Sequence, residues 1–291
     1  MPSLENRVVL ITGPARNIGR EIARAVARDG GHPVLAGLEF DRLERLRDEI
    51  GGRALAVEMD VTDDASVAAA FDAAAATFGR VDVVVSNAGV MGSGAVEAVG
   101  ANFLDRMLAI NLTGTYRVAH HAVPYLTLTR GYFLSVCSTA AVGHSPLQSH
   151  YCASKAGVYA MMDCFRQEVA HRGIDVGVLC PNFVAPATES GEPGPGTDEL
   201  MKQLWGNVNA EGTGTPVADV ARDAVHAMRV RARETTSPRS MFFVLKAPRL
   251  IQRLFEGRFK ADNVEQAVEA SRRLSGEGRS VTTAIGPTLQ G

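Results

Sequence analysis

Short apolar segments alternate with longer amphipathic segments along most of the chain. The apolar segments are continuous, as in RVVLIT and VDVVV, and such runs are typical of strands buried on both faces of a sheet. The pattern predicts strands over Arg7–Thr12, Val34–Ala36, Arg53–Glu58, Val81–Val85, Tyr132–Val136, Ile174–Leu179 and Met241–Leu245. It predicts helices over Asn17–Asp29, Asp41–Ile50, Asp63–Phe78, Asn102–Thr129, His150–His171 and Val217–Arg233.

The regular succession of strand and helix determines the expected fold. A strand, a helix and a second strand form a right-handed crossover, and repeated crossovers give a parallel, doubly wound α/β sheet. We expect one such domain over residues 1–245, with a substrate-binding loop at 186–215. Residues 246–291 are expected to form a C-terminal extension that is mostly helical or partly disordered.

Composition and charge narrow the class of protein. The chain has 291 residues and a formal net charge of -2, so no overall basic field points to nucleic acid as a partner. We see no signal peptide and no stretch of the roughly 20 apolar residues that span a bilayer. The four cysteines form no CxxC pair, and nothing has the spacing of a metal site. We therefore expect a cytoplasmic protein with buried thiols and no metal.

A glycine-containing loop, Thr12–Gly19 (TGPARNIG), follows the first expected strand and opens the first expected helix. In a doubly wound sheet this position presents backbone N–H groups and the positive end of a helix to an anion. Gly13 permits a tight turn and a close approach of the backbone, and Gly19 permits the helix to pack against the strand. The loop therefore predicts a site for the phosphates of a dinucleotide.

The loop resembles the TGxxxGxG loop of the short-chain dehydrogenase/reductase family, with Asn17 in place of the middle glycine. Asparagine tolerates left-handed backbone better than most residues. Further segments resemble family motifs, in the family's order: Asp60–Val61, Ser86–Gly89 (SNAG), Ile110–Gly114 (INLTG), Ser138, and Tyr151–Lys155 (YCASK). The match runs over about residues 5–245. The resemblance implies a Rossmann-fold oxidoreductase that uses NAD(P) and assembles as a dimer or tetramer through its two long helices.

The resemblance also assigns roles to residues. The catalytic residues that it implies are Asn111, Ser138, Tyr151 and Lys155. The nucleotide-binding residues that it implies are Thr12, Gly13, Arg16, Asn17, Ile18, Gly19, Glu39, Asp60, Val61, Asn87, Ala88, Gly89, Tyr151, Lys155, Pro181, Val184 and Thr188. By resemblance, Lys155 holds the nicotinamide ribose and Ser138 hydrogen-bonds the substrate oxygen. Asn111 holds a water that links Lys155 to solvent.

Tyr151 is the expected general acid/base for hydride transfer between the nicotinamide and a carbonyl or secondary-alcohol carbon. A phenol serves in both directions if its pKa falls from about 10 towards the working pH. A nearby ammonium favours the phenolate, and residues four apart share one face of a helix. We therefore expect Lys155 to lower the pKa of Tyr151 by about 2–3 units.

The preference between NAD and NADP depends on residues after the second expected strand. The family's ribose-binding aspartate falls on Gly37 or, with a one-residue insertion, on Leu38, and neither is acidic. Glu39 is close enough to bind the ribose hydroxyls. Arg16 stands where many family members place a basic residue for the 2′-phosphate. We expect NADP, and NAD stays open.

The chain departs from the family pattern after the sixth expected strand. Pro181 and Val184 match, but Asn182 replaces a glycine and Pro186 stands where a threonine is usual, with Thr188 as the nearest substitute. These departures keep an alternative open, in which the chain is a catalytically idle dinucleotide-binding regulatory protein.

The substrate-binding loop and the residues around the site suggest a substrate class. Met201, Leu204 and Trp205 have helical spacing and either line an apolar substrate pocket or pack the loop on the body. His144 and His150 are expected at the rim of the site rather than in its chemistry. The expected substrate is a small, apolar carbonyl or alcohol compound.

A basic amphipathic segment opens the C-terminal extension. Ala247–Lys260 (APRLIQRLFEGRFK) combines leucines with arginines and resembles helices that touch a membrane surface. We expect it to pack on its own protein or on a neighbouring subunit instead of a membrane.

Overall fold

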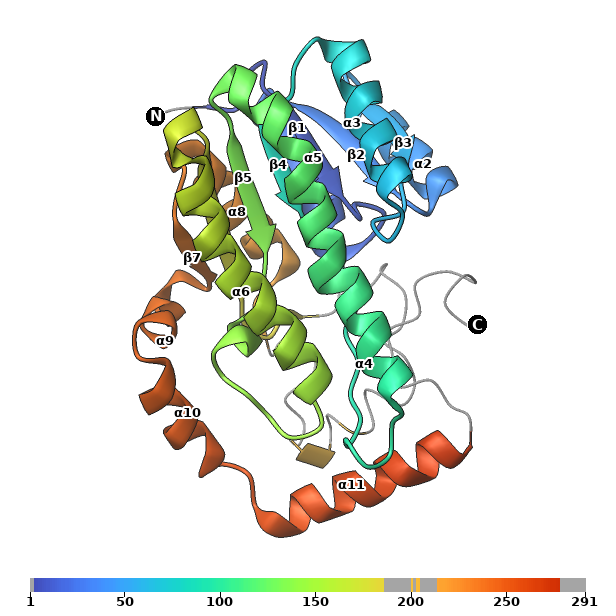
Figure 1. The fold of residues 1–291 in the computed structure, drawn as a ribbon, viewed down its shortest axis with the longest axis vertical. Coiled ribbons are helices and arrows are strands. Elements are labelled where there is room, and N and C mark those ends of the chain that lie inside the picture. The colour runs from blue at the N-terminus through green and yellow to red at the C-terminus, as the bar shows by residue number, and fades with distance from the viewer. Residues whose placement is uncertain (1–2, 186–199, 201–202, 205–213, 278–291) are drawn as a thin grey trace.

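The computed structural model describes residues 3–185, 200, 203–204 and 214–277. Within these residues, a parallel sheet of seven strands in the order β3-β2-β1-β4-β5-β6-β7 forms the centre (Figure 1). The strands are β1 (Val8–Thr12), β2 (His32–Gly37), β3 (Leu55–Glu58), β4 (Val83–Ser86), β5 (Tyr132–Val136), β6 (Asp175–Pro181) and β7 (Glu234–Ser237). The predicted doubly wound α/β sheet is confirmed.

Helices cover both faces of the sheet. One face carries α1 (Asn17–Arg28), α2 (Phe40–Ile50) and α8 (Val217–Val230). The other carries α3 (Asp64–Phe78), α4 (Ala101–Leu108), α5 (Gly114–Thr129) and α6 (Ser149–Val169). Alternate residues of β1 serve the two cores: Val8 and Leu10 pack under α3 and α5, and Val9 and Ile11 pack under α1 and α8. Burial on both faces explains the continuous apolar runs in the sequence.

The sheet reverses its winding between β1 and β4. β1 pairs with β2 on one side and with β4 on the other, and later strands are added outward from these two edges. Ligands of such sheets bind in the crevice outside the carboxyl ends of the strands at this reversal. The glycine loop follows β1 and the SNAG segment follows β4, so the fold brings these two segments to the same crevice.

The long helix predicted over Asn102–Thr129 runs without a break but changes its winding once. α4 passes into α5 through a π-helical turn at Ala109–Thr113. Single π turns within α-helices are frequent at functional sites. This one contains Asn111, one of the predicted catalytic residues.

The last strand lies earlier in the chain than predicted. The predicted strand Met241–Leu245 is wrong, because Phe242–Lys246 forms the helix α9 and β7 pairs with β6 instead. β7 has the polar sequence ETTS, yet Ser237 is fully buried and its hydroxyl donates to the carboxylate of Asp223 at 2.8 Å. Hydroxyl side chains satisfied in this way leave no apolar signal in the sequence.

After the sheet the chain continues as an arm of α9, α10 (Pro248–Glu256) and α11 (Ala261–Gly276). In Figure 1 the arm runs along one side of the molecule, and α11 crosses its lower end below α4 and α6. Polar contacts attach α11 to the body: Ala95 N–H donates to Ser271 Oγ at 2.9 Å, and Arg272 pairs with Glu97 at 2.6 Å. A separate apolar cluster lies beneath α11 and contains Leu147, Leu200, Leu204, Ala267, Ala270 and Leu274.

Candidate active site

The shape of the glycine loop depends on its two glycines. Gly13 has a φ of 64°, in the left-handed region, and its N–H donates to Ala36 O at 2.8 Å. A Cβ atom at Gly13 would lie 2.9 Å from Ala88 Cα, and one at Gly19 would lie 2.6 Å from Gly13 O. A side chain at either position would therefore push the loop away from its neighbours.

The start of α1 is suited to an anion. Asn17, where the family has a glycine, adopts a φ of 46° as the first residue of this helix. Arg16 at the N-cap makes no side-chain capping hydrogen bond, and the first turn holds no acidic side chain. The first-turn N–H groups therefore keep the positive character that attracts phosphate. In this respect the residues fit the diphosphate of a dinucleotide.

Thr12 joins the glycine loop to the loop after β4. Its buried Oγ1 accepts hydrogen bonds from Asn87 N–H at 2.9 Å and Ala88 N–H at 2.8 Å. Asn87 Nδ2 donates in return to Thr12 O at 3.0 Å and to Gly13 O at 3.1 Å. The two motifs therefore form one connected wall of the crevice between β1 and β4.

Asn111 holds the next part of the same loop. Its buried Oδ1 accepts from Val90 N–H at 2.8 Å, and its Nδ2 donates to Val90 O at 2.9 Å and to Ser154 Oγ at 3.0 Å. Ser154 precedes Lys155 on α6, so one amide links the loop after β4 to that helix. A Cβ atom at Gly89 would lie 3.1 Å from Asn111 Oδ1 and 3.6 Å from Lys155 Nζ. Because protein groups occupy the amide, the water-holding role of Asn111 stays a prediction.

Tyr151, Lys155 and Ser138 form one cluster. Lys155 Nζ donates to Val136 O at 3.1 Å and lies 5.8 Å from the centre of the Tyr151 ring. The side chains of Ser138 and Tyr151 are hydrogen-bonded to each other. Ser138 Oγ also accepts from Ala140 N–H at 3.1 Å and caps the 3₁₀ turn after β5. The structure thus brings together the three side chains that the motifs predicted.

Burial opposes the charged form of both Tyr151 and Lys155. Burial raises the pKa of Tyr151 above its ordinary value, and the hydrogen bond with Ser138 offsets this rise only in part. Burial also lowers the pKa of Lys155. The expectation that Lys155 acidifies Tyr151 is therefore wrong for the protein alone, which holds the phenol protonated.

A charged cluster stands just beyond the end of β2. Glu39 forms a bidentate pair with Arg16, whose Nε lies 2.9 Å from Oε2, and Arg42 Nε lies 3.2 Å from Oε1 of the same carboxylate. The hydrogen bond from Arg16 holds the pKa of Glu39 below its ordinary value. Gly37, two residues earlier, borders the glycine loop, since a Cβ atom there would lie 3.6 Å from Gly13 Cα. Within this cluster, the two arginines and one carboxylate sum to one net positive charge.

Comparison with known proteins identifies the family. A family model described as short chain dehydrogenase matches residues 7–193. The chain belongs to this family. Of the relatives of this short-chain dehydrogenase, the D-threitol dehydrogenase of Mycolicibacterium smegmatis is 36% identical over 208 residues, which cover 69% of this chain and 79% of the relative.

Two solved structures share the fold of this short-chain dehydrogenase. A 3-ketoacyl-(acyl-carrier-protein) reductase from Brucella melitensis, complexed with NADH, has a TM-score of 0.69 at 28% identity, covering 80% of this chain and 97% of the other. An alcohol dehydrogenase from the archaeon Thermococcus sibiricus, complexed with 5-hydroxy-NADP, has a TM-score of 0.68 at 27% identity, covering 80% and 96%. The family resemblance drawn from the motifs is confirmed.

The other predicted nucleotide-binding residues follow the carboxyl ends of strands or the glycine loop. Asp60 follows β3, and its Oδ1 accepts from the N–H and the hydroxyl of Thr62, each at 2.8 Å. Val61 is buried next to it, Ile18 of α1 is partly buried against the core, and Pro181 ends β6. Val184 pairs with Thr215 in an isolated bridge. Thr188, Pro186, Met201 and Trp205 lie outside the described residues.

The structure bears on one departure from the family pattern, Asn182, and on one open alternative, the role of Leu204. Asn182 is accommodated after β6, because its N–H donates to Ser237 O at 2.9 Å and its Oδ1 accepts from Thr139 Oγ1 at 3.1 Å. Leu204 is buried in the cluster beneath α11, which favours packing on the body over lining a substrate pocket.

The prediction that His150 stands at the rim is wrong. His150 is buried, its Nε2 lies 2.8 Å from Gly92 O, and its ring packs edge-on against Phe103 at 4.5 Å. Burial lowers the pKa of His150. Its contact with Gly92 O links α6 to the loop before α4. His144 is exposed as predicted.

Sequence reasoning missed Ser154 as a member of the site. Ser154 Oγ donates to Tyr151 O at 2.8 Å while it accepts from Asn111. It therefore connects two predicted catalytic residues. The only available signal was a small polar residue inside the YCASK motif, one position before Lys155.

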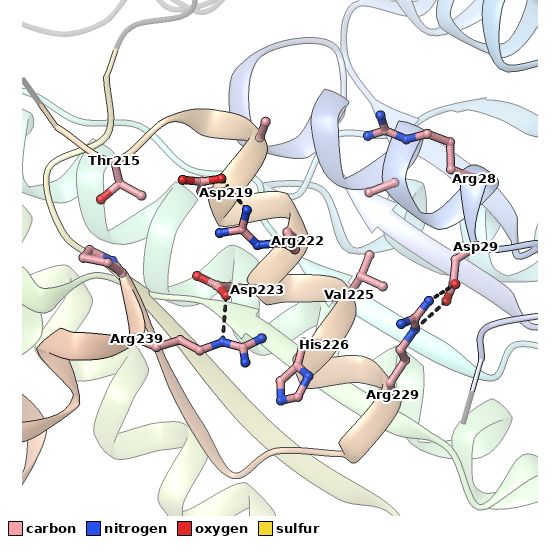
Figure 2. A pocket seen from close by; sticks show the side chains of 13 residues that line it. Arg28, Asp29, Thr215, Asp219, Arg222, Asp223, Val225, His226, Arg229 and Arg239 are labelled. Carbon is pink, nitrogen blue, oxygen red and sulfur yellow. Dashed lines mark hydrogen bonds and ion pairs between the residues drawn. The ribbon is translucent and has the colours of Figure 1, made fainter. Parts of the chain in front are cut away.

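The larger of two described cavities lies away from this cluster. It has a volume of about 710 Å³ and is lined by residues of α1 and α8 and by the segment after β7 (Figure 2). Figure 2 shows three of its arginines directed at aspartates, with Arg239 at 2.8 Å from Asp223. The smaller cavity, about 380 Å³, lies between α11 and the segments Ala95–Glu97 and Pro146–Leu147.

The described residues contain neither a candidate membrane span nor a candidate metal site. No helix there is long and apolar enough to pass through a bilayer. The histidine, cysteine and acidic side chains of the same residues form no group that could hold a metal ion.

Proposed function

We propose that this chain is an NAD(P)-dependent oxidoreductase that transfers a hydride between the nicotinamide and a carbonyl or secondary-alcohol carbon. One observation carries the proposal: the Tyr151–Lys155 pair adjoins the wall of the nucleotide crevice. Lys155 Nζ would lie 3.6 Å from a Cβ atom at Gly89, and Gly89 follows the two residues that Thr12 ties to the glycine loop. Relatives of this fold bound to NADH and to 5-hydroxy-NADP support it.

Tyr151 is the proposed proton donor and acceptor. The nicotinamide, when bound, supplies or accepts the hydride. The Ser138 hydroxyl orients the substrate oxygen beside the Tyr151 hydroxyl, to which it is already bonded. Burial holds Tyr151 protonated, the form that donates to a carbonyl oxygen during reduction. Lys155 Nζ, 5.8 Å from the ring centre, stabilises the negative charge that proton transfer leaves on Tyr151.

Lys155 and Asn111 have supporting roles in the proposal. Lys155 holds the nicotinamide ribose, because its ammonium faces the loop of Gly89. Asn111 is a positioning residue for that loop, and its backbone carbonyl is the remaining candidate for binding a water. That carbonyl also accepts from Thr115 Oγ1 at 2.7 Å.

We propose NADP as the preferred cofactor, by a small margin over NAD. Arg16 and Arg42 together outweigh the charge of Glu39, so the edge of the crevice attracts a 2′-phosphate. Glu39 in turn offers an acceptor for ribose hydroxyls, which keeps NAD binding possible. The preference for NADP over NAD is small because the Glu39 carboxylate pairs with both arginines.

The proposed substrate is apolar. The 380 Å³ cavity lies beside Leu147, in the segment that joins Ser138 to Tyr151, and Val96, Val264 and Val268 also line it. An apolar part of a carbonyl or alcohol compound fits this lining. The proposal includes residues 1–245 as the nucleotide-binding domain, with Thr188 as a contact of the nicotinamide.

We also propose that the chain is a cytoplasmic homodimer or homotetramer assembled through α4, α5 and α6. Leu104 and Tyr116 are 37% and 59% exposed on this helical layer. Exposed apolar side chains on long helices are suited to a symmetric contact with a second copy. Light scattering of the purified protein measures this mass directly.

A fluorescence titration and a turnover panel test the function. NADPH and NADH are titrated separately, and the protein is then assayed with ketones and secondary alcohols of increasing apolar bulk. We expect both nucleotides to bind, NADPH more tightly, and turnover to increase with apolar bulk. Failure to bind either nucleotide would overturn the proposal. Binding without turnover on any compound would favour the idle regulatory protein.

A further inference from the structure

The arm after the sheet leaves an apolar stripe uncovered. Leu250 and Leu254 lie one helical turn apart on α10 and are 61% and 65% exposed. Phe242 and Phe243 of α9 are 41% and 56% exposed. Among the described residues, therefore, packing on the body does not cover this part of the extension. Contiguous exposed apolar side chains of this size mark interaction surfaces.

Cations without partners adjoin the same stripe. Arg249 and Arg253 lie one turn apart on α10, each next to a leucine, and Arg258 and Lys260 follow the helix. None of these four side chains forms an ion pair or hydrogen bond within the described residues. Glu256 is the single carboxylate between residues 248 and 260. The segment therefore has a clear excess of positive charge.

The charge decides between a second copy of the chain and a lipid surface. A symmetric contact between two copies would set the unpaired arginines of α10 in one copy against those of the other, and like charges that meet in this way are unfavourable. Leucines beside unpaired arginines are instead the composition of helices that lie in the headgroup region of anionic membranes. We propose that residues 242–260 bind the surface of a membrane that contains anionic lipid. The leucines enter the boundary between headgroups and acyl chains, and the arginines meet the lipid phosphates.

One contact connects this surface to the catalytic segment. Gln252 Oε1 accepts from His144 N–H at 2.6 Å, and Gln252 Nε2 donates to His144 O at 3.3 Å. His144 lies between Ser138 and Tyr151 in the chain. A lipid-bound arm therefore holds the rim of the cleft near the membrane, where apolar substrates dissolve.

Sedimentation with vesicles tests the proposal on the full chain, without any need for turnover. The probes are vesicles of phosphatidylcholine alone and of phosphatidylcholine mixed with phosphatidylglycerol. R249Q/R253Q removes two cations of the surface, and L250S/L254S removes the leucines. R28Q/R45Q makes the same charge change at two other exposed arginines, and L128S changes a leucine that is 86% exposed on α5. Circular dichroism verifies that each variant is folded.

We expect the protein to bind only the vesicles that contain phosphatidylglycerol, and to bind them more weakly as salt is added. R249Q/R253Q should bind about 30-fold more weakly, and L250S/L254S at least about tenfold more weakly. The R28Q/R45Q and L128S proteins should bind like the parent. Absence of binding, or equal loss in all variants, would overturn the proposal. A third result would also overturn it: the protein does not bind vesicles but self-associates, and L250S/L254S abolishes the self-association. That result would assign the stripe to contact with a second copy of the chain.

Discussion

Replacing Asn111 by leucine is a direct test of how the loop after β4 is held in place. Leucine branches at Cγ as asparagine does, but it can neither donate nor accept a hydrogen bond. It would leave Val90 N–H and Val90 O without their partners at 2.8 and 2.9 Å. Ser154 Oγ would lose one donor but would keep its own bond to Tyr151 O. Two buried backbone groups thus become unsatisfied.

The expected cost follows from these two groups. A buried donor or acceptor without a partner costs about 1–3 kcal/mol, so N111L should lose about 2–6 kcal/mol of unfolding free energy. Because Gly89 precedes Val90, nucleotide affinity should also fall, by about tenfold for each 1.4 kcal/mol of lost positioning. The two effects have one cause and should appear together.

Urea unfolding followed by circular dichroism measures the stability, and fluorescence titration measures the nucleotide affinity. N102L is the matched control, since Asn102 is exposed at the start of α4 and should change stability by no more than about 0.5 kcal/mol. If N111L loses less than about 1 kcal/mol and binds nucleotide normally, the hydrogen bonds of Asn111 do not hold the loop.

Three further predictions concern other parts of the fold. G19A should weaken nucleotide binding at least about tenfold and lower stability by about 1–3 kcal/mol, because its Cβ would meet Gly13 O at 2.6 Å, whereas G276A, with nothing within 4 Å, should do neither in the same two assays. E39Q should raise the ratio of NADPH to NADH affinity about five- to tenfold by removing one negative charge, and an unchanged ratio would remove the charged cluster from cofactor selection. The pKa of Asp29 is held below its ordinary value, mainly by a hydrogen bond from Arg229. The ion pair therefore stabilises the folded protein fully above the pKa of Asp29 in the unfolded chain. This stabilisation is lost as the pH falls through the lower pKa of Asp29 in the folded protein. R229Q should therefore cost more stability at neutral pH than at about pH 3 in urea unfolding, and an equal cost at both would contradict this linkage.

The parts of the fold that the sequence predicts are those whose signal lies in contiguous residues. β1 and β4 are apolar at every buried position except Thr12 and Ser86, so their burial on both faces is visible as an unbroken run. The glycine loop and the YCASK motif each contain their chemistry within a few residues. Their meeting in one crevice then follows from the rule for parallel sheets.

The parts of the fold that the sequence does not predict depend on contacts between residues far apart in the chain. β7 forms a strand because the Ser237 hydroxyl donates to Asp223 and the backbone of β7 pairs with β6. Neither partner is adjacent to β7 in the sequence. His150 is buried because Gly92 and Phe103 surround it, which no local pattern indicates. The electrostatics of the site have the same origin. The i, i+4 spacing of the Tyr–Lys pair predicts an acidified phenol, but burial contributed by other elements reverses the direction of the shift.

Tyr151 is the group proposed to move a proton at the substrate oxygen, and the turnover of Y151F at saturating nucleotide reports on that role without an intervening step. Y159F is the matched control, because Tyr159 lies two turns further along α6 and donates its hydroxyl to Glu234 at 2.7 Å. Loss of the proton donor should reduce turnover by about 100- to 10,000-fold while nucleotide affinity stays near that of the parent. If Y151F turned over substrate as fast as Y159F, a group other than Tyr151 would have to move the proton.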